Sequence, residues 1–239
     1  MGGPEPQVLL FTIDAGGGHR SATRALVAAA EETGTVWSFQ VESFQEILLR
    51  LDLLKRLTGV SLEDAYNLIL RRHWNALMVP LLRVMHGLVR LRRRALVRTL
   101  TEWLQERPRP AAVVSVMPNF NGIMKEALQA AHPGVPFIVV LTDLADFPPR
   151  FWIEPGVDRL VVGTDEARQQ ARELGLPSDH VTRVSGMILK PSFYRRGGAD
   201  AATAVREEMG LGDGFVVTLL FGGKGSPEMR PLAEALLGA

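Results

Sequence analysis

Short runs of β-forming apolar residues alternate with helical segments along the chain, and this alternation limits the folds that it can adopt. The clearest runs are 8–13, 111–116 and 137–141, and each is continuously apolar instead of alternating polar and apolar. A continuous run of this kind is typical of a strand that is buried on both faces, as in a parallel sheet. Strands that alternate with helices form βαβ units. The sequence therefore predicts an α/β fold with a doubly wound, mostly parallel, Rossmann-like sheet.

Weaker signals complete the predicted first domain. Gly175 and Pro177 end a helical segment, because glycine favours the left-handed turn after a helix and proline cannot continue one. A long segment at 44–104 is helical almost throughout, with interruptions near Gly59 and at Pro80. Further strands are expected at 36–41, 160–162 and 181–184, and further helices at 21–32, 123–131 and 165–174.

The strand and helix pattern starts again after a stretch at 186–200 that is rich in glycine and basic residues, which we interpret as a linker. Beyond it we expect a helix at 201–209, a strand at 215–221 and a helix from about residue 227. One strand and one or two helices cannot bury a core of their own. The sequence thus predicts a first domain at 1–185 and, at 201–239, either the start of a second, incomplete domain or a tail that packs on the first.

Charge and cysteine content argue against several classes of protein. The chain has 27 Lys and Arg against 26 Asp and Glu, whereas a nucleic-acid-binding protein needs an excess of basic side chains to neutralise phosphates. It has no cysteine, which excludes disulfides and thiolate chemistry and suits a reducing compartment. No acidic cluster suited to a hard cation stands out, so we expect no metal.

The N-terminal region gives no sign of a signal peptide or membrane span. Its first residues lack a basic segment, and the apolar run at 8–13 is too short to cross a bilayer. We therefore expect a cytoplasmic protein whose contact with a membrane is peripheral, on the inner face.

Three successive glycines, Gly16, Gly17 and Gly18, precede His19 between the first strand and the first helix. Open α/β sheets bind ligands at the carboxyl ends of their strands. Glycines let backbone N–H groups approach a ligand closely, and a helix start adds a partial positive charge. A histidine titrates near neutral pH, so His19 suits a general base that removes a proton from a hydroxyl. The alternative is a simple turn with an exposed or capping histidine.

Neither glycine cluster matches a common nucleotide-binding motif. If Gly16 and Gly18 were the first glycines of a dinucleotide fingerprint, the third would fall at Ser21. A second cluster, Gly222-Gly-Lys-Gly225, follows the expected strand at 215–221. It is not a P-loop, because Gly225 occupies the Ser/Thr position and Thr218 the position of the first glycine. A dinucleotide-dependent oxidoreductase is therefore disfavoured.

The segment 81–100 is locally basic and amphipathic. Arg83, Arg90, Arg94 and Arg98 fall on one side of a helix at 100° per residue, and apolar residues gather opposite them. Such a helix could bind an anionic membrane surface, each cation contributing about 1 kcal/mol. Alternatively, its apolar face packs on the sheet and the arginines face solvent. Both hold if the helix packs inward while the arginines and an adjoining loop meet the bilayer.

Five segments of the chain, taken together, indicate a known family. They are the first strand with Gly16-Gly-Gly-His19, Val139-Val-Leu-Thr-Asp-Leu144 with Trp152, Val161-Val-Gly-Thr-Asp-Glu166 with Gly175-Leu-Pro, Gly186 with Lys190-Pro-Ser-Phe193, and Phe221-Gly-Gly-Lys-Gly225. In this order they resemble monogalactosyldiacylglycerol synthases and processive diacylglycerol glucosyltransferases, which are GT-B glycosyltransferases. One departure concerns Met117 and Pro118, followed by Asn119, where relatives usually have a His-Pro pair.

This resemblance implies two Rossmann-like domains, of which the first binds a diacylglycerol-type lipid and the second a UDP-sugar, with no further cofactor. It implies that His19 is the base acting on the acceptor hydroxyl and that Asp143 is a carboxylate in the same cleft. Asn119 and Trp152 are expected with the triglycine loop on the acceptor side. For Asp143 the alternative is an N-cap or loop carboxylate. The glycines expected at the donor diphosphate are Gly222, Gly223 and Gly225.

Two other functions remain open from the sequence. UDP-sugar 2-epimerases share the GT-B layout but need no lipid, and the basic segment and the triglycine loop with His19 favour a transferase over them. A non-catalytic module that binds acceptor or membrane is the other alternative, because we expect the second domain to be incomplete.

Overall fold

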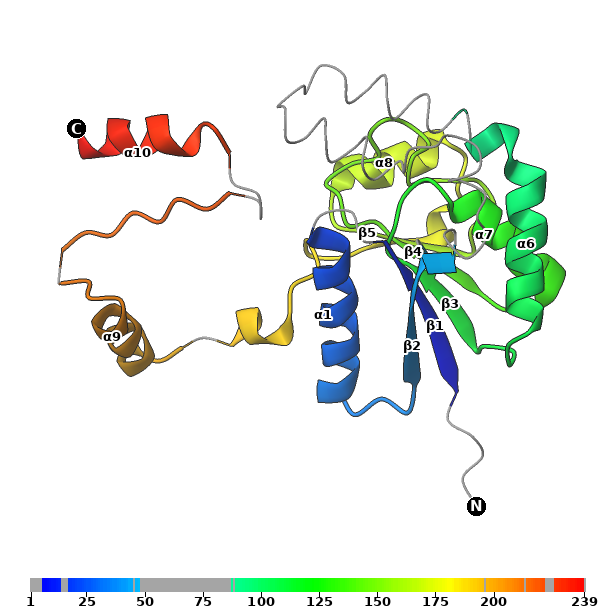
Figure 1. Ribbon diagram of the computed structural model, residues 1–239, viewed down its shortest axis with the longest axis horizontal. Coiled ribbons are helices and arrows are strands. Elements are labelled where there is room, and N and C mark those ends of the chain that lie inside the picture. Colours follow the sequence, from blue (N-terminus) through cyan, green and yellow to red (C-terminus); the bar gives the residue numbers. More distant parts are fainter. Residues whose placement is uncertain are drawn as a thin grey trace. The chain divides into compact units, whose positions relative to one another are not determined.

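The computed structural model describes residues 6–13, 17–44, 46–47, 87, 89–195, 197–212, 214–221 and 226–238. They belong to two compact units, Met1–Pro191 and Ser192–Ala239, whose elements are shown in Figure 1. The division falls inside the segment 186–200 that was predicted as a linker. The predicted domains 1–185 and 201–239 stay predictions.

The first unit contains a six-stranded, all-parallel sheet, which confirms the predicted fold class. The chain runs outward from β1 to β2 on one side and then returns to continue from β3 on the other. Strand order therefore reverses between β1 and β3, the position at which doubly wound sheets bind ligands. In spatial order the strands are β2 Ser38–Ser43, β1 Gln7–Thr12, β3 Ala112–Ser115, β4 Phe137–Val140, β5 Arg159–Val162 and β6 Val181–Arg183.

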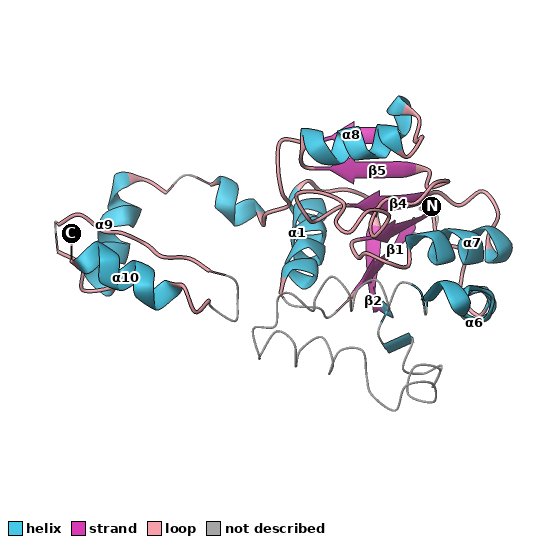
Figure 2. Cartoon of the chain, turned by 90° about the horizontal axis from the view of Figure 1, so that it is seen from above, coloured by secondary structure: helices cyan, strands magenta, loops and turns pink. Residues whose placement is uncertain are grey.

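Helices cover both faces of this sheet (Figure 2). One face packs against α6 Arg93–Gln105, α7 Asn121–Ala131 and α8 Asp165–Glu173, whose apolar side chains form the main core with those of the strands. On the other face, Leu26 of α1 Gly18–Glu32 packs against Leu10, Val116 and Val140. A short 3-10 turn, Ser178–His180, precedes β6.

The first helix begins three residues earlier than the sequence predicted. It starts at Gly18 instead of Ser21, and the N–H of Ser21 donates to the oxygen of Gly17 at 3.0 Å. His19 therefore lies within the first helical turn. This placement fixes the direction of its side chain relative to the strand ends.

Of the helix predicted at 81–100, residues 87 and 89–100 are described, and the chain turns at Arg92 before α6 begins, so the helix is not continuous there. Leu91, which helical periodicity places on the apolar side opposite the arginines, is 77% exposed. Arg90, Arg94 and Arg98 are exposed as expected, whereas Arg83 lies outside the described residues.

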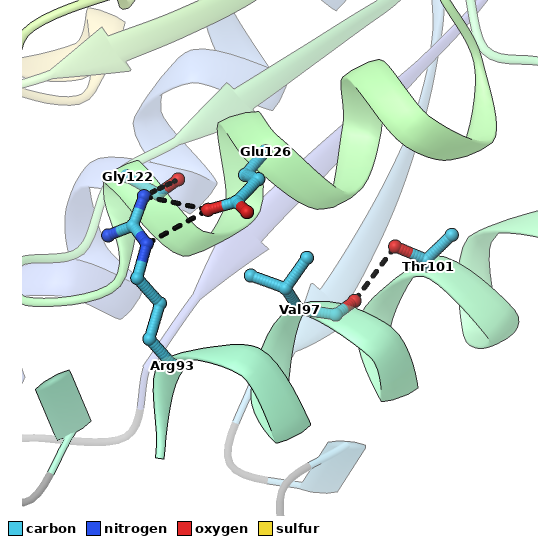
Figure 3. A network of polar contacts seen from close by, with 5 residues as sticks. All are labelled: Arg93, Val97, Thr101, Gly122 and Glu126. Atoms are coloured by element: carbon cyan, nitrogen blue, oxygen red, sulfur yellow. Dashed lines mark hydrogen bonds and ion pairs between the residues drawn. The ribbon is translucent and has the colours of Figure 1, made fainter. Parts of the chain in front are cut away.

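The side chain of Arg93 reaches α7 (Figure 3), although it is still 44% exposed. Its guanidinium contacts Glu126 at 2.9 Å and donates to the oxygen of Gly122 at 3.3 Å. A Cβ on Gly122 would meet the Glu154 carboxylate at 3.0 Å. Glycine at this position therefore leaves room for the side chain of Glu154 beside the Arg93–Glu126 ion pair, which links α6 to α7.

The second unit contains α9 Ala199–Glu208 and α10 Met229–Leu237, preceded by the 3-10 turn Pro191–Tyr194. The strand expected at 215–221 is not formed, because strand formation requires a hydrogen-bonding neighbour and none pairs with this segment among the described residues. Phe215 is 97% exposed. In neither described unit is any helix both long and apolar enough to cross a membrane.

Candidate active site

The candidate site lies at the carboxyl ends of β1, β3 and β4, at the point where strand order reverses. His19 follows β1, Val116 follows β3, and Thr142 and Asp143 follow β4. Because the strands are parallel, these three connections meet at one edge of the sheet. The fold therefore brings together residues that are more than 120 positions apart in the sequence.

The imidazole of His19 is oriented by a main-chain oxygen. Its Nδ1 lies 2.9 Å from the oxygen of Val116 and 3.3 Å from the hydroxyl of Thr142. A carbonyl can only accept a hydrogen bond, so Nδ1 carries the proton in this contact. In the neutral ring Nε2 is then unprotonated, which makes it the atom able to accept a proton from a substrate.

Trp152 connects His19 to Asp143. The Trp152 and His19 rings have centroids 5.7 Å apart and are tilted by 44°. The indole Nε1 of Trp152 donates to Oδ2 of Asp143 at 2.7 Å. Trp152 is fully buried, whereas Asp143 is exposed. The indole thus holds a carboxylate at the solvent-facing rim of the site, near the imidazole.

Burial lowers the pKa of His19 below its ordinary value, while the charge of Asp143 and the bond to Val116 oppose this shift. The neutral ring is therefore the main form at pH 7. Between the lowered pKa and the unfolded value of about 6.5, the unfolded chain binds more protons than the folded one. The free energy of unfolding consequently falls as pH drops through this window.

We predict that NMR titration will assign His19, among the five histidines, a pKa below 6.5 and a neutral form protonated at Nδ1. Replacing Asp143 by Asn should lower this pKa further, because it removes the charge that favours the imidazolium. His19→Gln identifies the resonance by its disappearance. A pKa at or above 6.5, or a proton on Nε2, would contradict the described geometry.

Asp146 is a buried residue of this region that the sequence did not single out. It is 1% exposed, and its carboxylate accepts N–H bonds from Arg150, Phe151 and Trp152. Burial raises its pKa, and these N–H bonds oppose the shift. The available signal was a second aspartate three residues after Asp143, but a sequence does not show which of two loop carboxylates is buried.

The other predicted residues are placed as follows. Gly17 is exposed just before α1, and Gly18 is its first residue. Asn119 is 5% exposed at φ 75°, and its N–H donates to the oxygen of Phe151, so it belongs to the same strand-end region. Gly16, Gly222, Gly223 and Gly225 lie outside the described residues. Asn119 also borders a hollow whose other lining residues are Val89, Arg90, Arg93, Ile123 and Glu154.

The part of the chain that the structure describes contains no group of three or more His, Asp or Glu side chains able to hold a metal ion. The chemistry available from the described side chains is proton transfer by His19 beside an exposed carboxylate.

The fold and the placement of this site define a Rossmann-like domain of the GT-B type. A solved structure with a similar fold is Anabaena Alr3699/HepE in complex with UDP and glucose, with a TM-score of 0.50 and 11% sequence identity. The superposition covers 98% of this chain and 58% of that one. At this identity the similarity concerns the fold alone.

The chain belongs to the monogalactosyldiacylglycerol (MGDG) synthase family, whose model matches residues 19–187. A probable monogalactosyldiacylglycerol synthase 2 of Oryza sativa subsp. japonica is 29% identical over 244 residues. Monogalactosyldiacylglycerol synthase 2 of Arabidopsis thaliana is 27% identical over 251 residues. Both alignments cover 96% of this chain and 48% of the relative, so the chain spans about half the length of these curated relatives. The resemblance inferred from the sequence is confirmed.

Proposed function

We propose that this protein transfers a hexose from a UDP-sugar to the hydroxyl of a diacylglycerol-type lipid. Membership of the MGDG synthase family supports this proposal, and galactose is the sugar in the names of its relatives. The observation on which it chiefly rests is the orientation of His19 by Val116, because this leaves Nε2 as the proton acceptor where the strand order reverses.

In the proposed reaction, Nε2 of His19 takes the proton of the acceptor hydroxyl. The hydroxyl oxygen forms a bond to the anomeric carbon of the sugar, the bond from that carbon to the diphosphate breaks, and UDP leaves with its electron pair. Asp143 stabilises the imidazolium electrostatically, in the same direction as its effect on the pKa of His19. Trp152 keeps the carboxylate in place through its indole N–H.

Exposed apolar side chains beside Asp143 suit a lipid acceptor. Leu144 is 66% exposed and Phe147 is 65% exposed, although both are large and hydrophobic. Hydrocarbon chains of an acceptor would cover such surface when its hydroxyl reaches His19. A water-soluble sugar acceptor gives no reason for exposing these two side chains at the site.

The deciding experiment follows radiolabel from UDP-hexose into organic solvent in the presence of diacylglycerol, using the full natural protein. Label in the lipid fraction supports the transferase, whereas label retained in water as an epimerised UDP-sugar supports an epimerase. Calorimetric titration with UDP tests the third possibility, since a chain that neither binds UDP nor transfers sugar would be a binding module.

We also propose peripheral binding to an anionic membrane through Arg90, Arg94 and Arg98, all of which are exposed. Replacing the three by Gln should weaken binding to anionic vesicles about 100-fold at low salt, because each cation near the surface contributes about 1 kcal/mol. Cosedimentation at several salt concentrations measures the effect, and binding should weaken as salt rises.

The matched control replaces three exposed arginines on other elements, Arg24, Arg159 and Arg172, which removes the same charge. Equal losses in the two triple variants, or salt-insensitive binding, would contradict a specific role for the α6 region. The location on the inner, cytoplasmic face stays a prediction.

A further inference from the structure

The loop that follows β4 is held to the rest of the first unit by contacts along its length. Two side chains of the α8 region make them. The hydroxyl of Thr164, the N-cap of α8, donates to the oxygen of Leu144. The side chain of Gln170 accepts the N–H of Asp146 at 2.8 Å and donates to its oxygen at 3.4 Å. The backbone of Asp146 is therefore fixed relative to the sheet.

The carboxylate of Asp146 in turn fixes the far end of the loop. Oδ2 accepts the N–H of Arg150 at 2.8 Å, and Oδ1 accepts those of Phe151 and Trp152 at 2.9 and 2.6 Å. Arg150 has φ 65°, a conformation that few non-glycine residues adopt. Three N–H bonds to one carboxylate offset this backbone strain and determine where the main chain of Trp152 lies.

The main chain that Asp146 holds carries the indole of the site. From this backbone position the ring of Trp152 reaches His19, with centroids 5.7 Å apart, and its Nε1 reaches Asp143 at 2.7 Å. The oxygen of Trp152 is held as well, because it accepts the side-chain amide of Asn121 at 2.9 Å. A shift of the Trp152 backbone would therefore change both the imidazole packing and the carboxylate contact.

Asp146 differs from Asp158, a second carboxylate that accepts a main-chain N–H beside the sheet. Asp158 accepts the N–H of Phe137 at 2.7 Å but is also paired with Lys125 at 2.6 Å, and it is only partly buried. Asp146 is almost completely buried, and its described side-chain bonds are all with main-chain N–H groups. Burying a carboxylate without a cationic partner destabilises the fold. The main effect of Asp146 that offsets this destabilisation is the geometry that it imposes on the loop.

We infer that Asp146 is a positioning residue for the active site, acting through Trp152 on the geometry of His19 and Asp143. This inference rests on the proposed function, in which His19 accepts the proton. Asp146 itself does not touch the reacting atoms. Neither the family resemblance nor the motif around Asp143 assigns it a role.

The test replaces Asp146 by Asn, which keeps the shape but removes the charge and turns an NH₂ group toward a main-chain N–H donor. We expect the NMR resonance of the Trp152 indole N–H to move toward that of a solvent-exposed indole, because its bond to Asp143 is weakened. We also expect the transfer rate of the full natural protein to fall about 10- to 100-fold, as misplacement of catalytic groups by about 1 Å does. Trp152→Phe assigns the indole resonance by its disappearance.

Asp158→Asn is the matched control, since it removes a carboxylate brace at the opposite ends of the strands. It should destabilise the fold without moving the Trp152 or His19 resonances. If Asp146→Asn does not fold, Gln170→Ala serves instead. It removes the two hydrogen bonds that the Gln170 side chain makes with the N–H and the oxygen of Asp146, and so loosens this residue.

The Trp152 and His19 resonances can be measured in a protein without activity. They therefore test the positioning role of Asp146 independently of the proposed function. An Asp146→Asn protein, or its Gln170→Ala substitute, with unchanged Trp152 and His19 resonances would overturn the positioning role. So would equal changes in Asp158→Asn. Inactive wild-type protein with a displaced Trp152 resonance in the Asp146 variant would instead reject the proposed function alone.

Discussion

Replacing His19 by Gln is expected to reduce sugar transfer by about 10² to 10⁴-fold, the usual contribution of a general base. Glutamine places its amide near the position of Nε2, but this amide cannot accept a proton at neutral pH. The measurement is the rate of label transfer to lipid in the full natural protein, together with the thermal unfolding midpoint. Lipid and UDP binding should change little.

His132→Gln is a matched control for this variant. The Nε2 of His132 also contacts a main-chain oxygen, that of Leu104, at 3.1 Å, but His132 lies at the end of α7, away from the strand ends that carry the site. It should retain transfer activity. If His19→Gln kept more than about a tenth of the activity, another group would have to be the base.

Replacing Trp152 by Ala is expected to cost about 3 to 5 kcal/mol of unfolding free energy, because the side chain is fully buried and its removal leaves a large cavity. Urea denaturation followed by circular dichroism measures this cost. The exposed carboxylate of Asp143 would lose its indole partner at the same time. Transfer should therefore fall even at temperatures where the variant remains folded.

Two further variants separate packing from hydrogen bonding at Trp152. Trp152→Phe keeps most of the ring but loses the N–H, so it should cost about 1 to 3 kcal/mol from the smaller ring and the lost bond. Trp37→Ala, at a residue that is 45% exposed, should cost much less than Trp152→Ala. An equal cost for both alanine variants would show that Trp152 is not packed as described.

The sheet could be predicted because its strands are buried on both faces. A continuous run such as 137–141 has few alternatives to a central parallel strand, and β4 forms there. The start of α1 was missed because glycines carry no helix signal, although Gly18 is its first residue. The segment 215–221 shows the opposite error, since its residues favour a strand but a strand also needs a partner.

Of the site, only those residues could be predicted whose side-chain type or motif indicates a function. Three glycines before a histidine directed attention to His19, and the motif around Asp143 led to the carboxylate and to Trp152. The contact from His19 to Val116 leaves no trace in the sequence, because every residue has a main-chain oxygen. Asp146 could not be distinguished from Asp143, since its burial follows from how the loop folds back on α8.

Because Nδ1 of His19 donates to the main-chain oxygen of residue 116, a change of side chain at that position leaves a proton acceptor in place. This oxygen moves only if the end of β3 moves, and Val116 is fully inaccessible to solvent. β3 lies in the interior of the sheet, between β1 and β4, so its end should stay in place until the sheet itself opens. Loss of transfer should therefore coincide with the global unfolding transition and not precede it.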